Sequence, residues 1–154
     1  MQWYTNWCKA AVAATMLLSS SAVWAGTVNL AGGMAIQGYD PVAYFTQSKA
    51  VPGDPTITAM YEGATYQFAS TADRELFVAD PAKYVPEFGG FCAYGTAKGY
   101  KVSIDPQAFS IVDGKLYLNY DKKIWATFEQ DTAGYIHKAE VNWPTVQQQP
   151  DPKN

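Results

Sequence analysis

Cysteine is scarce in this 154-residue chain, which contains two. Cys8 lies in an N-terminal segment with the pattern of an export signal, so Cys92 is the one thiol of the predicted mature chain. One thiol excludes an internal disulfide, and without a Cys-x-x-Cys pair the chain cannot run a dithiol redox cycle by itself. A lone cysteine in an exported protein is either a buried small hydrophobe or a reactive group, and both interpretations stay open here.

Basic side chains are few as well. The chain has 11 Lys and Arg residues against 14 Asp and Glu residues, with no basic cluster, which argues against nucleic-acid binding. There is one histidine, His137, and no HExxH motif, P-loop, dinucleotide fingerprint or Ser-His-Asp order. The common hydrolase, nucleotide-binding and metalloprotease classes are therefore excluded.

The first 25 residues are predicted to direct export. Lys9 precedes an apolar run from Ala10 to Leu18, and Val23-Trp24-Ala25 fits a signal-peptidase site after Ala25. The run is shorter than the about 20 residues that span a bilayer, although a retained anchor is the alternative. We therefore expect a periplasmic or secreted protein that has no contact with the membrane after cleavage.

Capping residues and turn signals divide the rest of the chain into short elements. Ser70 and Asp121 are predicted to cap helices, and Asp113-Gly114 is the strongest hairpin signal. Helices are predicted over 40–45, from 70, and over 81–85, 93–98, 121–130 and 132–142, the last ending near Trp143-Pro144. Strands are predicted over 57–61, 65–69, 100–104, 109–112 and 115–120.

These elements predict an α+β fold in one domain, with a small antiparallel sheet and short helices packed on it. The expected organisation is a signal peptide over 1–25, an extended lead-in over 26–37, the domain over 38–146 and a disordered tail over 147–154.

The run from Phe88 to Gly95 indicates a ligand-facing loop around Cys92. Gly89 and Gly90 allow close backbone approach and positive φ. A short helix after the loop would place Cys92 near free N–H groups, which lower a thiol pKa and favour the nucleophilic thiolate.

Three strings resemble the YHS domain: Gly38-Tyr39-Asp40-Pro41-Val42-Ala43-Tyr44-Phe45, then 63–70, then 77–84. That family includes modules of copper-transporting ATPases and of some hydroxylase systems, and many exported proteins. The remainder, from Phe88 to Trp143-Pro144, resembles the longer exported branch, in which some relatives hold selenocysteine at the position matching Cys92. The resemblance implies a soft, easily ionised nucleophile at that position.

The departures from the family concern its metal site. YHS modules proposed to bind heavy metals carry one cysteine after Asp-Pro-Val and another inside the Tyr-x-Phe-Cys-Ser motif, where this chain has Ala43 and Ala69. Alanine offers no lone pair, so the soft-metal site of the short modules is absent.

The candidate site is therefore built around Cys92. For ligand binding we consider Cys92 with Gly89, Gly90, Tyr94 and Tyr39. The lysines near the loop, Lys98 and Lys101, would lower the thiol pKa if they approached it.

For a metal such as copper or another soft ion, Cys92 and His137 are the candidate ligands, with weak binding expected. With one Cys and one His per chain, coordination would need carboxylates, water or a second chain, which makes a homodimer a candidate assembly.

Three functions follow from these residues. The first is an exported accessory protein, more a binding protein than an enzyme, that presents Cys92 to a metal ion or small ligand. The second is a one-cysteine redox enzyme whose nucleophile is recycled by an external thiol. The third is a structural module in which Cys92 is buried.

Overall fold

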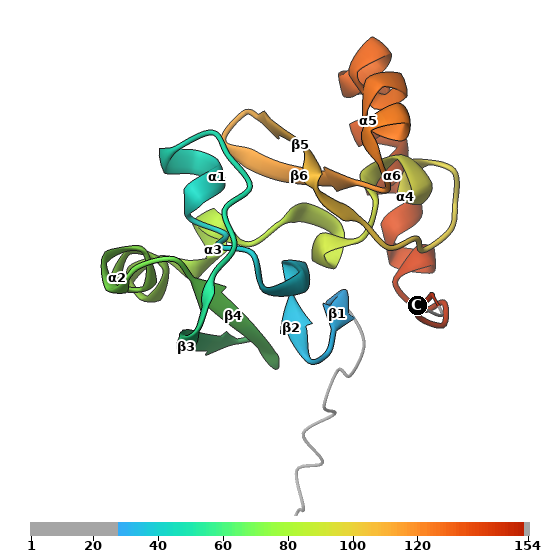
Figure 1. Cartoon of the computed structure of the whole chain (residues 1–154). Helices are drawn as coiled ribbons and strands as arrows, with labels where there is room; N and C mark the ends of the chain where they lie inside the picture. The colour runs from blue at the N-terminus through green and yellow to red at the C-terminus, as the bar shows by residue number, and fades with distance from the viewer. Residues whose placement is uncertain (1–27, 153–154) are drawn as a thin grey trace, which may run out of the picture.

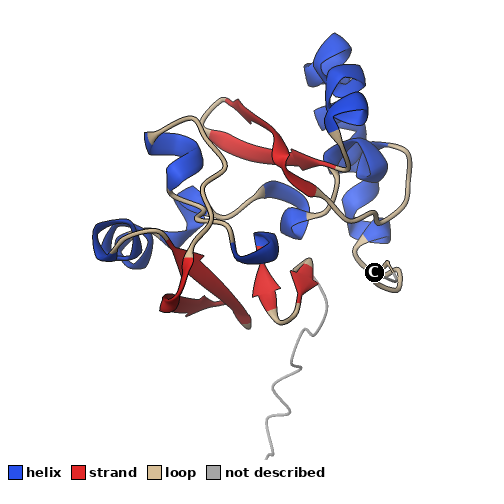
Figure 2. Cartoon of the chain, viewed as in Figure 1, coloured by secondary structure: helices blue, strands red, loops and turns tan. Residues whose placement is uncertain are grey.

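A computed structural model of the chain describes residues 28–152, and the predicted signal peptide lies outside this range. Figure 1 and Figure 2 show an α+β arrangement with short helices, as the sequence predicted, although the strands form two small sheets instead of one. Among residues 28–152, no helix has both the length and the apolar character that a bilayer span requires.

The first sheet has four strands in the order β1-β2-β4-β3. The bounds are β1 Leu30–Ala31, β2 Met34–Ala35, β3 Asp54–Tyr61 and β4 Ala64–Phe68. The β3–β4 hairpin confirms the predicted pair of strands, whereas β2 lies parallel to β4. Residues 30–35 are thus part of the sheet rather than a lead-in to it, and the 3-10 helix η1 (Ile36–Gly38) follows them.

The second sheet is the hairpin of β5 (Asp105–Val112) and β6 (Lys115–Asn119), which turns at Asp113-Gly114 as predicted. The predicted strand over 100–104 is wrong, because this segment forms no ladder. Its Val102 carbonyl instead accepts a hydrogen bond from the Cys92 N–H at 3.0 Å. β5 begins at Asp105 rather than at the predicted Phe109, and its first residues form a bulged strand end with a register shift before Phe109.

Six helices lie in the described part of the chain, and in Figure 1 they form two groups at opposite sides of the hairpin. The first group is α1 (Ala43–Thr46), α2 (Thr71–Ala79) and α3 (Pro81–Tyr84). The second is α4 (Ala93–Ala97), α5 (Lys122–Phe128) and α6 (Thr132–Val146). The 3-10 helices η2 (Glu87–Gly90) and η3 (Glu129–Asp131) precede α4 and α6.

Local capping chemistry explains where the longer helices begin. The Ser70 hydroxyl accepts from the Asp73 N–H at 3.1 Å, and the Asp121 carboxylate from the Ile124 N–H at 2.7 Å, as predicted. The predicted end of α6 near Pro144 is wrong. The helix continues to Val146, which is fully buried, so packing of this last turn outweighs the hydrogen bond that Pro144 cannot donate.

Strand β6 has both faces buried and therefore joins two hydrophobic cores. Leu116 and Leu118 pack into the core that also contains Tyr66, Phe68 and Phe77, and the rings of Phe68 and Phe77 are 5.1 Å apart. Tyr117 points to the opposite face, as the alternation of a strand requires. It packs there into a second core with residues from α4, α5, α6 and η2, namely Ala93, Ala97, Phe128, Ala139 and Phe88.

Residues 147–152 are not disordered, as the predicted tail would be, and residues 153 and 154 lie outside the described range. The Gln149 side chain donates to the Gly99 carbonyl at 2.8 Å and accepts from the Lys101 N–H at 3.2 Å. Asp151 pairs with the Lys101 ammonium at 3.0 Å. This polar segment is ordered because the Gln149 side chain forms hydrogen bonds with backbone groups of Gly99 and Lys101, which have no partner in a helix or strand.

Asp40 is a fully buried carboxylate that ties α1 to the end of β4. Its Oδ1 accepts from the Val42 and Ala43 N–H groups at 2.8 and 3.3 Å, and its Oδ2 accepts from the Ala69 N–H at 2.8 Å. Burial raises the pKa of Asp40 to about 6 from an ordinary 3.8, against the lowering effect of the Ala69 and Val42 N–H groups, and Asp73 raises it further.

We predict that Asp40 makes stability depend on pH. The folded carboxyl group keeps its proton up to about pH 6, whereas the unfolded one loses it near 3.8, so unfolding releases a proton between these values. The stabilisation that the protonated Asp40 side chain gives the folded state is fully present below pH 4 and is lost as the pH rises through 6. Urea unfolding should show the wild type losing up to about 3 kcal/mol between pH 4 and 7 relative to Asp40→Asn, which cannot ionise.

Asp73→Asn is the matched control for this prediction. Its backbone N–H still reaches Ser70, but the charge that raises the Asp40 pKa is removed, so the loss between pH 4 and 7 should shrink. Parallel pH profiles for the wild type and Asp40→Asn would contradict the assignment.

Candidate functional site

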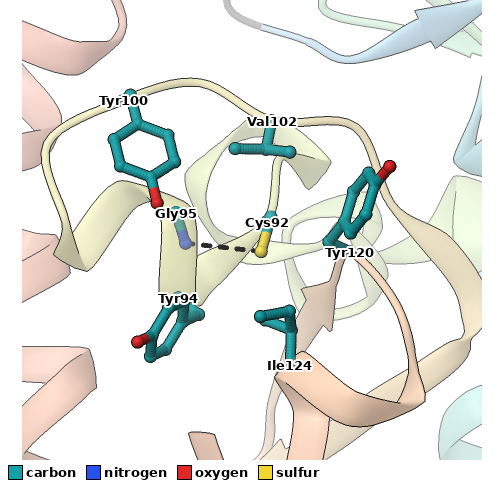
Figure 3. A pocket seen from close by; sticks show the side chains of 7 residues that line it. All are labelled: Cys92, Tyr94, Gly95, Tyr100, Val102, Tyr120 and Ile124. Atoms are coloured by element: carbon teal, nitrogen blue, oxygen red, sulfur yellow. Dashed lines mark hydrogen bonds between the residues drawn. The ribbon is translucent and has the colours of Figure 1, made fainter. Parts of the chain in front are cut away.

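Cys92 is the N-cap residue of α4, and its thiol takes the place that a serine hydroxyl or an aspartate carboxylate usually fills. The Sγ atom accepts from the Gly95 N–H at 3.3 Å, as Figure 3 shows. The thiol also contacts Asn119 Oδ1 at 3.8 Å, in the geometry of a donated S–H hydrogen bond. The predicted position of Cys92 at a helix start is therefore confirmed.

A small pocket of about 100 Å³ opens next to this thiol (Figure 3). Its seven lining residues come from α4, from the segment after it, and from the β6–α5 connection with the first turn of α5: Cys92, Tyr94, Gly95, Tyr100, Val102, Tyr120 and Ile124. Cys92 is 1% exposed, whereas Tyr100 and Tyr120 are about half exposed. The thiol therefore lies at the inner end of the pocket and the two tyrosines near its mouth.

The thiol pKa shifts in the direction opposite to the prediction. Burial raises the pKa of Cys92, and Asp121 adds to the rise, while the backbone N–H groups of Gly95, Tyr120 and Tyr94 oppose it. The N–H groups at the helix start do favour the thiolate, but loss of hydration outweighs them. Cys92 is consequently a neutral thiol at neutral pH.

Neither lysine near the loop is among the main groups that shift this pKa, which is raised and not lowered. The Lys98 ammonium lies 5.2 Å from the centre of the Tyr94 ring and 5.6 Å from that of Tyr135. The Lys101 ammonium pairs with Asp151 and lies 4.8 Å from the centre of the Phe91 ring. The predicted electrostatic activation of the thiol by lysine is therefore wrong.

Asn119 is the residue of this site that the sequence analysis missed. It is fully buried at the end of β6, and its Oδ1 accepts from the Tyr94 N–H at 3.2 Å as well as facing the thiol. Its Nδ2 has no hydrogen-bond partner within residues 28–152. The signal available in the sequence was one amide side chain, Asn119, directly after the run Leu116–Leu118 and two residues before the capping Asp121.

Gly95 allows the wall of the pocket to approach α4. A Cβ atom at this position would lie 2.7 Å from Val102 Cγ2 and 3.2 Å from the Tyr100 carbonyl oxygen. A glycine is therefore required where the chain of residues 100–102 crosses the helix.

The predicted glycines before Cys92 do not line the pocket. Gly90 has a φ of +76° and packs against Pro86, and its carbonyl accepts from the Asn29 side chain at 3.1 Å. The Gly89 carbonyl accepts from the Asn29 N–H at 2.8 Å. Both glycines shape η2 and anchor the N-terminal strands, so their role lies in the fold.

The structure separates the remaining candidates from Cys92. Tyr39 ends η1 and bridges to Pro52, outside the pocket. His137 is exposed on α6 and does not line the pocket either, so no Cys–His pair forms there. Within residues 28–152 there is no group of three or more His, Cys, Asp or Glu side chains placed to hold a metal ion.

The two positions that the family resemblance assigns to metal-binding cysteines lie around one carboxylate. The N–H groups of Ala43 and Ala69 donate to Oδ1 and Oδ2 of Asp40. This location is separate from the Cys92 pocket, and two alanines supply no ligand there.

A wider depression of about 360 Å³ lies beside Trp125 and Glu129. The Trp125 Nε1–H donates to the Ser110 hydroxyl at 2.9 Å and to Glu129 Oε1 at 3.2 Å, and Ser110 donates to Glu129. These polar side chains satisfy one another, which indicates a structural network between β5, α5 and η3 rather than a second site.

Comparison of the chain with protein-family models, with curated proteins and with solved structures finds no match in any of the three. The resemblance to the YHS family therefore stays a prediction from the quoted strings.

We predict that alkylation of Cys92 will report a raised thiol pKa. In the full chain carrying Cys8→Ser, the rate of reaction with iodoacetamide should keep rising with pH beyond the ordinary thiol value of 9.0, since burial disfavours the thiolate. Free glutathione supplies the reference rate, and unfolding in urea should bring the Cys92 rate up to it. A rate that levels off below pH 7 would contradict a neutral, buried thiol.

We also predict that Gly95 and Val102 are energetically coupled. Gly95→Ala should lower the free energy of unfolding by about 1–3 kcal/mol through overpacking against Val102. In a Val102→Ala background the clashing Cγ2 atom is absent. Gly95→Ala should then lower the free energy of unfolding by a smaller amount. Urea unfolding of the four chains measures the coupling, and strictly additive costs would show that the contact does not limit the site.

Proposed function

We propose that this chain is a small-molecule binding protein, and that it holds a neutral, mostly apolar ligand in the pocket next to Cys92. The observation that carries the proposal is a pocket of about 100 Å³ with side chains from three segments of the chain meeting around a buried, neutral thiol. Export to the periplasm or out of the cell, as the N-terminal segment predicts, belongs to the same proposal.

The apolar character of the lining supports a ligand without charge. Val102, Ile124 and the tyrosine rings offer apolar surface, and no lining residue is a lysine, arginine, aspartate or glutamate. A charged group moved into such a pocket would lose hydration without gaining an ion pair. A neutral ligand incurs no such penalty.

The size of the pocket limits the ligand to a few heavy atoms. An apolar cavity of 150 Å³ accommodates benzene, so about 100 Å³ suits a smaller branched alkyl group or the tip of a longer molecule. The half-exposed rings of Tyr100 and Tyr120 would then contact whatever part of the ligand extends from the mouth.

The properties of the thiol favour binding over redox catalysis. A peroxidatic cysteine reacts as a thiolate, and burial of Cys92 disfavours that form. No lining residue is a histidine, carboxylate or lysine that would take the proton. The one-cysteine redox enzyme is therefore the weaker hypothesis.

A soft metal ion does not fit the residues of the pocket. Of the seven lining residues only Cys92 offers a soft ligand, and copper or zinc sites are built from several thiolate or imidazole groups. His137, the proposed second ligand, is exposed on α6 and does not line the pocket.

Titration with a graded series of neutral alcohols tests the proposal. Ethanol, 2-propanol and isobutanol should shift the amide NMR signals of residues 92–95, 100–102 and 120–124. Affinity should rise about fourfold per added carbon, since each buried CH₂ contributes about 0.8 kcal/mol. Benzyl alcohol should bind more weakly than isobutanol, because its ring exceeds the pocket.

Two tryptophan substitutions on α5 make the test specific. Ile124→Trp fills the pocket and should abolish the shifts, whereas Lys123→Trp, at an exposed neighbouring position, should leave them unchanged. Shifts that persist in Ile124→Trp, or that spread over the surface in every variant, would overturn the proposal.

A further inference from the structure

One wall of the Cys92 pocket, formed by residues 99 to 102, contacts the C-terminal segment on its outer side. Tyr100 and Val102 line the pocket, while the intervening Lys101 points away from it, into contact with Phe91. The backbone on both sides of Tyr100 is bound by one side chain, that of Gln149. Residues 147–151, which we name the strap, therefore lie against the outer side of this wall.

Both polar atoms of the Gln149 side-chain amide form hydrogen bonds with the wall. Its Nε2 donates to the Gly99 carbonyl at 2.8 Å, and its Oε1 accepts from the Lys101 N–H at 3.2 Å. A second contact joins Asp151 to the Lys101 ammonium at 3.0 Å. The Lys101 side chain is 2% exposed, so the ammonium group of this ion pair is buried in the protein.

The strap can leave without unfolding the helix that carries it. The Gln147 N–H still bonds to the Trp143 carbonyl as the cap of α6, and the backbone after it makes turn hydrogen bonds from the Gln148 and Gln149 N–H groups to the carbonyls of Thr145 and Val146. The Asp151 side chain is 57% exposed, so water and salt reach the ion pair.

Helix α6 itself stays attached through other contacts. The Asn142 side chain donates to the Thr96 and Ala97 carbonyls at 3.2 and 3.1 Å, and Val146 is fully buried.

The wall also has attachments of its own to α4. The Gly99 N–H donates to the Thr96 carbonyl at 3.0 Å and the Tyr100 N–H to the Gly95 carbonyl at 3.1 Å. Together with the bond from the Cys92 N–H to the Val102 carbonyl at 3.0 Å, these bonds keep residues 99 to 102 near the helix when the strap leaves. Release of the strap therefore loosens the wall and leaves the fold in place.

We propose that the strap sets how far the Cys92 pocket opens. While Gln149 and Asp151 hold the wall, the pocket admits groups of a few heavy atoms. When the strap is displaced, Tyr100 moves outward while Val102 stays bonded to the Cys92 N–H, and larger groups reach the thiol. This inference rests on the proposed function for its biological meaning, but its test requires only that Cys92 be the thiol observed.

Two neutral thiol reagents of different size test the strap in the full chain carrying Cys8→Ser. The small reagent is methyl methanethiosulfonate and the large one is 4,4′-dithiodipyridine. Gln149→Ala removes both hydrogen bonds to the wall and should raise the rate with the large reagent by about fivefold or more, and the rate with the small one by less than about twofold. Asp151→Asn should act in the same direction more weakly, since its ion pair is half exposed.

Gln148→Ala is the matched control, because Gln148 is exposed and makes no side-chain hydrogen bond to the wall. It should leave both rates unchanged. Equal acceleration of both reagents by Gln149→Ala, together with a lower melting temperature, would indicate general unfolding and overturn the strap. Unchanged rates in Gln149→Ala would overturn it too. Failure of the binding proposal is separate, since it appears as missing alcohol shifts in the wild type.

Discussion

The site depends on one contact: the Cys92 thiol caps α4 from inside the protein rather than from its surface. The Gly95 N–H bonds to Sγ, the Cys92 N–H bonds to the Val102 carbonyl, and Asn119 faces the thiol. The cap therefore fixes the helix start, the wall of the pocket and the end of β6 together. A surface cap would have left the thiol hydrated and its pKa low, whereas this buried cap keeps it neutral.

That contact lies at the boundary between the two hydrophobic cores. Cys92 belongs to the core that contains Leu116 and Leu118, while Ala93, the next residue, belongs to the core with Tyr117. The start of α4 and strand β6 thus each contribute to both cores. The pocket lies on the side of the first core, since its lining residues Val102 and Ile124 pack there beside Cys92.

Features set by neighbouring residues could be predicted from the sequence, and those set by distant contacts could not. The caps at Ser70 and Asp121, the turn at Asp113-Gly114 and the helix start at Cys92 all depend on atoms a few residues apart. The segment 100–104 alternates like a strand, but its partner is Gln149, about fifty residues away. The thiol pKa was predicted in the wrong direction for the same reason, since Tyr120, Ile124 and Asn119 bury the thiol from another part of the chain.

The position of Asp40 explains how the motif that resembles the YHS family can serve a chain without the family's metal-binding cysteines. Three backbone N–H groups, at Val42, Ala43 and Ala69, donate to its carboxylate. The junction of α1 with β4 is therefore independent of which side chains stand at 43 and 69. In this chain both are alanine, so the junction keeps its structural role and carries no ligand chemistry. Among residues 28–152 the one thiol lies elsewhere, at Cys92, where a pocket opens beside it.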